Sequence, residues 1–263
     1  MVNLGRGILQ PHKAEQSFSV ERRDPSAPLV GVVERYWITT WDLRGEQPHR
    51  QNVLPHPRIN VTFLPGRARI AGVVRGLFTE QLAESGRVIG VMFRPGAFRG
   101  YLGAAVSTLT DRFVDIDDHF GPAGVELADR VIAAETGAAI AEIETFLLER
   151  QPPADPSVEL AAKAVDTVAS APDLLRVDDL AAALALPMRG LQRLFHEYVG
   201  VGPKWVIRQY RMHEATDVAA TGAAVDWAAL AHRLGYSDQA HFVRDFTSRV
   251  GMSPTAYARL CAR

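Results

Sequence analysis

The sequence is poor in cysteine, since its 263 residues include only Cys261. A single thiol excludes a disulfide within the chain and any metal site built from several cysteines. Long apolar runs are missing too, because no stretch approaches the roughly 20 residues that a membrane-spanning helix needs. The first residues, MVNLGRGILQPHKAEQ, lack the basic-then-apolar plan of a secretory signal. We therefore expect a reducing, cytoplasmic environment.

Net charge is also nearly absent, with a formal value of -1 beside a hydrophobic fraction of 47%. This balance hides an asymmetry along the chain. Residues 187–263 carry ten Lys and Arg against six Asp and Glu, whereas residues 1–186 carry 19 against 24. A mildly basic end on an acidic body indicates a polyanionic partner for that end alone.

Short β-rich segments, broken by proline and glycine, occupy residues 18–93; LVGVVERYWITTW and GRVIGVMF are two of them. Such punctuated strands are typical of a sandwich or a barrel. The proline-rich QPPADPS, residues 151–157, predicts a linker, and amphipathic helical segments follow it. The expected fold is α+β with two domains. Residues 1–150 form a β-barrel or sandwich with helices, residues 151–157 the linker, and residues 158–263 an all-α domain.

The C-terminal part contains one unit twice. LQRLFHEYVGVGPKWVIR matches FVRDFTSRVGMSPTAYAR at an offset of 51, and LAAAL of residues 180–184 matches LAHRL of residues 230–234 at an offset of 50. One residue has therefore been added at the turn of the second unit. A short helix with small residues, a tight turn that includes Gly235, and a second helix ending before Gly-x-x-Pro predict two helix-turn-helix units. Pro203 and Gly222 mark the expected ends of the helix that joins the units.

The second helix of each unit has an apolar face and a polar face. In the last unit Phe242 and Phe246 fall on the apolar face, which packs the unit. The polar faces carry arginine, glutamine and histidine, and such long donors and amides read base edges and grip phosphates. We predict that these faces enter the major groove of DNA. The alternative is an ordinary solvated helix.

Residues from about 158 to 261 resemble the DNA-binding domain of AraC/XylS-type transcription regulators. The resemblance rests on DWAALAHRLGYSDQAHFVRDFTSRVGMSPTAYAR and on LQRLF with VGVGPKWVIRQYR. It implies that the second helix of each unit is a recognition helix that binds double-stranded DNA. The implied contact residues are Arg189, Gln192, Arg193, Gln239, Ala240, His241 and Arg244. One departure is Gly190, which offers no side chain to a base and lowers the helix propensity of the first recognition helix.

Residues 18–120 are similar in outline to the cupin-like sensor domains that precede this DNA-binding domain, in an uncharacterised subgroup. VERYW, LPHPRINVTF and GVMFRPGAFRGYLG carry this resemblance. It implies that an effector binds inside a small barrel, and the aromatic residues of this part predict a small apolar or aromatic effector. The predicted effector-binding residues are Trp37, Phe63, Phe93, Arg94, Phe98 and Tyr101. The alternative for each aromatic residue is an ordinary place in the core, and the alternative for Arg94 is a surface salt bridge. We predict no metal or other cofactor, because His49 and His56 lack ligand spacing.

The favoured function is an effector-responsive, sequence-specific DNA-binding transcription regulator without catalytic activity. RNA polymerase is a further expected partner. So is a second copy of the chain, bound through the stripe Ile140, Ile143 and Leu147 of residues 138–149. The alternative is that this stripe packs on the barrel of its own chain. Two alternatives stay open: a DNA-repair alkyltransferase, for which Cys261 is the sole thiol, and a metal-dependent cupin enzyme that carries a DNA-binding module.

Overall fold

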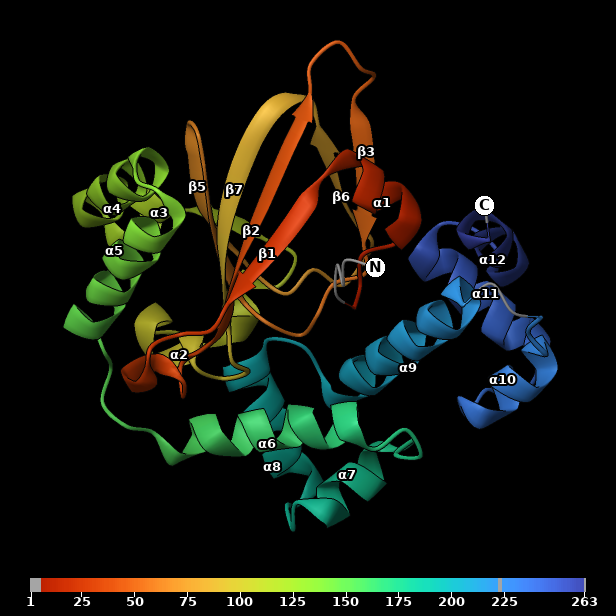
Figure 1. Ribbon diagram of the computed structural model, residues 1–263. Coiled ribbons are helices and arrows are strands. Elements are labelled where there is room, and N and C mark those ends of the chain that lie inside the picture. Colours follow the sequence, from red (N-terminus) through yellow and green to blue (C-terminus); the bar gives the residue numbers. More distant parts are fainter. Residues whose placement is uncertain (1–5, 222–223, 263) are drawn as a thin grey trace.

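The computed structural model describes residues 6–221 and 224–262. Its N-terminal part is built on antiparallel strands (Figure 1). The strands are β1 (Ser19–Arg23), β2 (Val33–Leu43), β3 (His49–Val53), β4 (Asn60–Leu64), β5 (Arg67–Ala71), β6 (Phe78–Leu82), β7 (Glu84–Phe93) and β8 (Phe113–Asp115). Six of them form one sheet in the order β1-β2-β7-β4-β5-β8, and β3 pairs with β6 as a separate ribbon. The ribbon faces the larger sheet, and together they form an incompletely closed barrel.

Helices cover one side of the larger sheet. The short elements of the N-terminal part are α1 (Pro11–Ser17), η1 (Ala27–Leu29), α2 (Phe98–Leu102), η2 (Val106–Leu109) and α3 (Ile116–Phe120), followed by α4 (Pro122–Ala133) and α5 (Thr136–Glu149). Figure 1 shows α3, α4 and α5 together on the side of the sheet away from α10, α11 and α12. Side chains along a strand alternate between the two faces of the sheet. Every second residue therefore packs under the helices, and the residues between them point into the barrel.

The C-terminal part is helical. It contains α6 (Pro156–Ser170), α7 (Val177–Ala183), α8 (Met188–Leu194), a π-helical turn η3 (Phe195–Val199), α9 (Pro203–Ala220), α10 (Trp227–Arg233), α11 (Gln239–Val250) and α12 (Pro254–Cys261). In Figure 1, α9 leads from the group α6–α8 to the group α10–α12. The joining helix begins at Pro203 as predicted, while its predicted end at Gly222 lies outside the described residues.

The hydrophobic core continues from the sheet into both helical groups. One cluster joins Phe93 and Phe98 of the N-terminal part to Leu180 and Phe195 of the first helix pair. A second cluster joins Leu54 to the helices around Phe246. The sheet-rich part therefore shares a hydrophobic core with each of the two helical groups.

The predicted α+β fold, with a barrel-like N-terminal part and a helical C-terminal part, is confirmed. The stretch between Glu149 and Pro156 is not helical and overlaps the linker predicted at residues 151–157. The predicted interface stripe on α5 lies largely inside this chain, since Ile143 and Leu147 are 2% and 4% exposed. Within residues 6–221 and 224–262, no helix combines the length and apolar character needed to cross a bilayer.

Candidate functional site

The second repeated unit is α10, a tight turn and α11. Its turn contains Gly235 at φ +75°, a left-handed conformation that glycine adopts without cost. Asp226 and Asp238 cap the two helices; Asp238 accepts a hydrogen bond from the backbone N–H of His241 at 2.7 Å. This hydrogen bond lowers the pKa of the Asp238 carboxyl. A capped start fixes the N-terminal turn of α11, which is the part of a recognition helix that reaches base edges.

The apolar face of α11 is buried. Phe242 and Phe246 are both 0% exposed, and Val250 is 1% exposed. The Phe246 ring meets Tyr257 of α12 at 5.9 Å between centroids, and Phe242 meets Trp227 of α10 at 6.3 Å. Ring packing on two sides therefore sets the rotation of α11 about its own axis.

The opposite face of α11 is open to solvent. The residues predicted to contact DNA there, Gln239, Ala240, His241 and Arg244, are all exposed. Among the described residues, neither Gln239 nor Arg244 has a side-chain hydrogen bond or ion-pair partner. His241 is held by Ser237, whose hydroxyl lies 3.2 Å from Nδ1, and by the Tyr236 ring at 5.2 Å. Unpaired donors on a rotationally fixed helix suit contacts with another molecule.

Asp245 anchors α11 from its buried side, a role that was not predicted from the sequence. The hydroxyl of Tyr236 donates to one of its carboxylate oxygens at 2.8 Å, and Arg208 and Arg249 donate to the other at 2.6 and 3.2 Å. Burial by itself raises the pKa of this carboxyl, but the hydrogen bond and the two positive charges leave the pKa lowered. Asp245 stays charged and ties α11 to α9, which carries Arg208.

The first repeated unit follows the same plan. α7 and α10 begin 50 residues apart, and α8 and α11 begin 51 apart, which confirms the predicted extra residue in the second turn. Ala185 occupies the turn position equivalent to Gly235 and has φ +52°, a conformation that costs a residue with a Cβ. The predicted contact residues Arg189, Gln192 and Arg193 are exposed, and within the described chain none has a polar side-chain partner.

The first recognition helix is shorter than the second. α8 has seven residues, and no side chain of the described residues caps its start; η3 then continues it as a π-turn. Gly190 lies in the first turn of α8, within 3.3 Å of a Pro187 ring carbon when a Cβ is added. The end of this helix rests on the N-terminal part, where Thr110 donates to the carbonyl of Gly200 at 2.5 Å.

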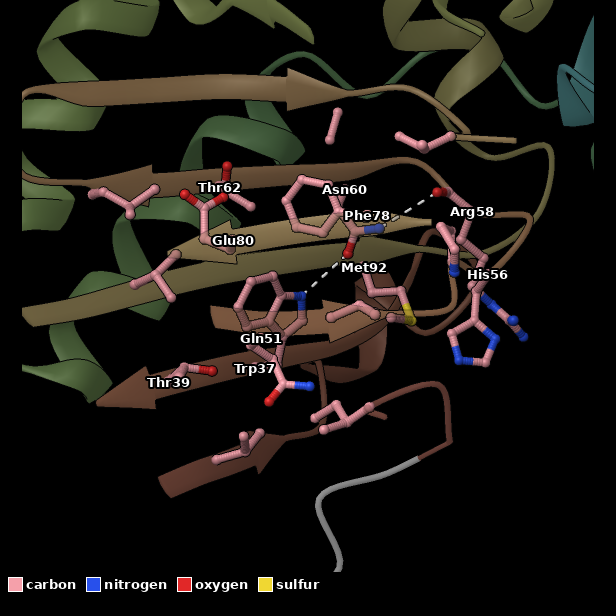
Figure 2. A pocket seen from close by; sticks show the side chains of 18 of the residues that line it. Trp37, Thr39, Gln51, His56, Arg58, Asn60, Thr62, Phe78, Glu80 and Met92 are labelled. Carbon is pink, nitrogen blue, oxygen red and sulfur yellow. Dashed lines mark hydrogen bonds between the residues drawn. The ribbon is translucent and has the colours of Figure 1, made fainter. Parts of the chain in front are cut away.

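A cavity of about 360 Å³ lies between the larger sheet and the β3–β6 ribbon. All eight described strands contribute to its mostly apolar wall. Figure 2 shows Trp37, Asn60, Phe78 and Met92 gathered inside it, with His56 and Arg58 at one end. This is a partly open hollow whose surface is mostly apolar and to which several polar and charged side chains also contribute, a combination suited to a small molecule.

Two tryptophans form a floor of this cavity because glycines lie beneath them. Trp37 pairs with Gly90 across β2 and β7, and Trp41 pairs with Gly86. A Cβ on Gly90 would stand 2.0 Å from the Trp37 ring, and one on Gly86 would stand 2.2 Å from the Trp41 ring. The Trp37 Nε1–H donates to Asn60 Oδ1 at 3.1 Å and fixes the ring. The equal spacing of the two Trp and the two Gly in their strands is the sequence signal for this floor.

Most of the predicted effector-binding residues do not line the cavity. Trp37 does, but Phe63, Phe93, Phe98 and Tyr101 belong to the core cluster on the helix-covered side of the sheet. Strand alternation places Phe63 opposite its cavity-lining neighbours on β4. Arg94 approaches Asp166 of α6 at 3.9 Å instead of the cavity. The structure therefore divides the six residues into four core aromatics, one cavity residue, Trp37, and one arginine near α6, Arg94.

The alkyltransferase alternative depends on Cys261, and the metal-dependent enzyme alternative on histidines such as His49 and His56. All three side chains are engaged in contacts within the chain. Cys261 is 4% exposed, and burial raises the pKa of its thiol, which disfavours the reactive thiolate. His49 contacts Gln51 and Ser17, while His56 stacks on His213 of α9. In the described parts of the chain, no three His, Cys, Asp or Glu side chains gather as potential metal ligands.

Comparison with known proteins finds matches to two separate parts of the chain. Residues 21–115 match the family described as "Domain of unknown function (DUF6597)", and residues 180–260 match the family described as "Helix-turn-helix domain". The chain is 32% identical to Regulatory protein PocR of Salmonella typhimurium over 108 residues, which are 40% of this chain and 34% of PocR. It thus spans about a third of that relative's length.

Solved structures of ToxT from Vibrio cholerae are also similar. One aligns at 12% identity with a TM-score of 0.42, over 94% of this chain and 98% of ToxT. Another, of ToxT with an unsaturated fatty acid bound, aligns at 12% identity with a TM-score of 0.38, over 93% of this chain and 95% of ToxT.

Two helix-turn-helix units with caps, turns and exposed polar faces lie in and around the matched residues 180–260. The C-terminal part of this chain is an AraC-type helix-turn-helix DNA-binding domain.

Proposed function

We propose that the whole chain is a transcription regulator that reads two short blocks of one DNA site through α8 and α11. The observation that carries this proposal is a pair of helices, each buried on one face, whose exposed faces present arginine and glutamine without partners in the described chain. Arginine and glutamine make the bidentate contacts that discriminate guanine and adenine in the major groove. The two faces carry different residues, so the site has no need to be palindromic.

The joining helix supports two contacts on one face of the duplex. α9 has 18 residues, so it spans about 27 Å at 1.5 Å per residue. Turns at each end add to this offset, which brings the two helices close to the roughly 34 Å of one DNA turn. We therefore propose blocks about 10 base pairs apart, centre to centre.

Selection from a random duplex library with the purified chain, followed by footprinting, tests this proposal. Two protected major-groove segments on one face are expected, with affinity falling steeply as salt rises. Replacing Gln192 and Arg193 by alanine should remove protection from one segment only. A single protected segment that is unchanged in that double variant would contradict reading by the first unit.

We also propose that a small apolar or aromatic molecule occupies the cavity and changes the affinity for DNA. The apolar wall and the Trp37 ring, which hydrogen-bonds Asn60 and lies partly open to the cavity, support this. Compounds of this class should raise the melting temperature of the chain and quench tryptophan fluorescence. In Trp37→Leu the affinity for such compounds should fall, while DNA binding without them persists. A Trp37→Leu chain that binds every compound as the wild type does would contradict this placement.

We propose, further, that one chain is sufficient for DNA binding. Dimerisation through residues 138–149 was predicted from an apolar stripe that needs a partner to cover it. Ile143 and Leu147 of this stripe are buried within the chain itself, so they need no second copy to cover them. Sedimentation of the DNA complex should give one chain per site, and two chains per site would refute this. RNA polymerase stays a predicted partner.

A further inference from the structure

The segment Leu54–Arg58, between β3 and β4, belongs to both the cavity and the DNA-binding part. Pro55, His56 and Arg58 line one end of the cavity. The same segment faces α9, the helix that joins the two recognition units. A change in the shape or charge of that end of the cavity therefore acts on a segment in direct contact with α9.

Three polar contacts fasten the segment to α9. The carbonyl of Pro55 accepts hydrogen bonds from Gln209 Nε2 at 2.6 Å and from His213 Nε2 at 3.1 Å. Arg58 donates to the hydroxyl of Tyr210 at 3.2 Å. These contacts are in a protected environment, since Gln209 is 1% and His213 0% exposed. Hydrogen bonds shielded from water are costly to leave unmade, so the segment and α9 move together.

Ring stacking adds to this attachment. The imidazoles of His56 and His213 lie 4.4 Å apart between centroids at 10° between planes. Gly7 packs against both rings at φ +99°, and a Cβ there would stand 2.6 Å from the carbonyl oxygen of Leu54. The close approach leaves space for glycine only, so the position of His56 on α9 is narrowly defined.

From α9 the contacts continue to the second recognition helix. The Oε1 atom of Gln209 accepts a hydrogen bond from Arg249 Nη1 at 3.0 Å, while its Nε2 atom donates to the carbonyl of Pro55. Arg249 also donates to Asp245, the residue that anchors α11. Gln209 thus bridges the cavity segment and α11 with the two ends of one amide.

On the cavity side, Glu34 controls Arg58. Glu34 lines the cavity and accepts hydrogen bonds from both Arg35 and Arg58. A ligand group that competes for Glu34 or for Arg58 alters a contact that reaches Tyr210 directly. The carboxylate is therefore the point at which the content of the cavity acts on α9.

We infer that Leu54–Arg58, with Glu34 on one side and Gln209 on the other, couples the cavity to the orientation of α11 and thereby sets the affinity of the second unit for DNA. The inference rests on the proposed function, because it needs an occupant of the cavity to act on. Glu34, Arg58 and Gln209 are positioning residues in this scheme, and none of them has to touch DNA.

The test uses the full chain and a duplex that the wild-type chain itself selects from a random library. Glu34→Gln removes the charge that holds Arg58 and stands in for an occupied cavity. Its matched control is Glu142→Gln, which removes an exposed carboxylate paired with Arg130 at 2.8 Å on α4 and α5, away from the cavity and from α9. We expect the dissociation constant for the duplex to change at least 5-fold in Glu34→Gln, within the usual range of about 5- to 150-fold for coupled sites. It should change less than about 2-fold in Glu142→Gln.

The coupling itself is read from a double-mutant cycle. In a Gln209→Met background, or in the milder Tyr210→Phe background, the effect of Glu34→Gln should shrink to less than half its value in the wild type. An effect of Glu34→Gln that equals that of Glu142→Gln, or that survives in full in both backgrounds, overturns the inference.

Hydrogen exchange keeps the inference testable without DNA. Glu34→Gln should speed exchange of the backbone amides of residues 239–250 and leave those of α4 unchanged. If the chain selects no duplex, the proposed function is contradicted. The exchange measurement then still shows whether Glu34 and α11 are coupled. Unchanged exchange in residues 239–250 overturns the inference whatever the DNA result.

Discussion

Lowering the pH from 7 to 4 should destabilise the folded chain through the stacked pair His56 and His213. The His213 ring is fully buried and His56 is half-buried, and each donates its Nε2–H to a backbone carbonyl, those of Pro55 and Arg6 respectively. Their Nδ1 atoms are buried without a hydrogen-bond partner in the described structure. Adding a proton to either Nδ1 would place a charge where nothing accepts its hydrogen bond.

The magnitude follows from the pKa of His56. Burial lowers this pKa from 6.5 to about 4, and the positive charges of Arg58 and Arg35 act in the same direction. The carbonyl of Arg6 and the charge of Glu34 oppose the fall without cancelling it. Each tenfold change in proton affinity is worth about 1.4 kcal/mol. The lowering of the His56 pKa from 6.5 to about 4 therefore corresponds to a loss of about 3 kcal/mol of unfolding free energy when the pH falls.

The sign comes from proton binding. Between pH 6.5 and about 4 the unfolded chain holds a proton on His56 that the folded chain lacks. The free energy of unfolding therefore falls as the pH drops through this window. Above the window the contribution of the neutral His56 is complete, and below it this group causes no further loss. Burial, and the like charge of the neighbouring His56, also lower the pKa of His213, which adds a loss of the same sign.

Urea unfolding followed by tryptophan fluorescence at a series of pH values measures this loss. His56→Gln removes the titrating group, so its stability should change less than that of the wild type between pH 6.5 and 4. His12→Gln, at an exposed position on α1, should follow the wild-type profile. The reasoning is refuted if His56→Gln and the wild type lose the same free energy over this window.

Three further predictions concern the repeated units. Arg244→Ala and Gln239→Ala should each weaken specific DNA binding by about 5- to 150-fold without lowering the melting temperature, because both side chains are exposed and unpartnered in the described chain; fluorescence anisotropy and thermal melting measure the two effects. Phe246→Ala should destabilise the chain by about 3–5 kcal/mol in urea, because this ring is fully buried. A melted Arg244→Ala beside a stable Phe246→Ala would mean that the two faces of α11 are reversed. Ala185→Gly should stabilise the chain by about 0.5–1 kcal/mol, since it relieves a left-handed alanine. No gain in the urea midpoint would show that this turn is relaxed.

The helix-turn-helix units were predictable because their signals are local. Apolar spacing sets which side of α11 packs, and Gly235 sets the turn, all within a dozen residues. The offset that changes from 50 to 51 appears in the sequence and recurs in the helix starts. The exposed positions of Arg189, Gln192, Arg193, Gln239, Ala240, His241 and Arg244 follow from the same periodicity.

The sequence by itself therefore determined the class of fold, the repeated unit and the two faces of each recognition helix. Only the tertiary structure decided which aromatic residues surround the cavity. Both faces of the larger sheet are buried, one by α3–α5 and the other by the β3–β6 ribbon, so alternation along a strand cannot tell Trp37 from Phe63. Tertiary structure alone also brought His56 to His213 and Pro55 to Gln209. Those pairs are more than 150 residues apart, and short-range pattern carries no information about contacts that chain folding makes at such separations.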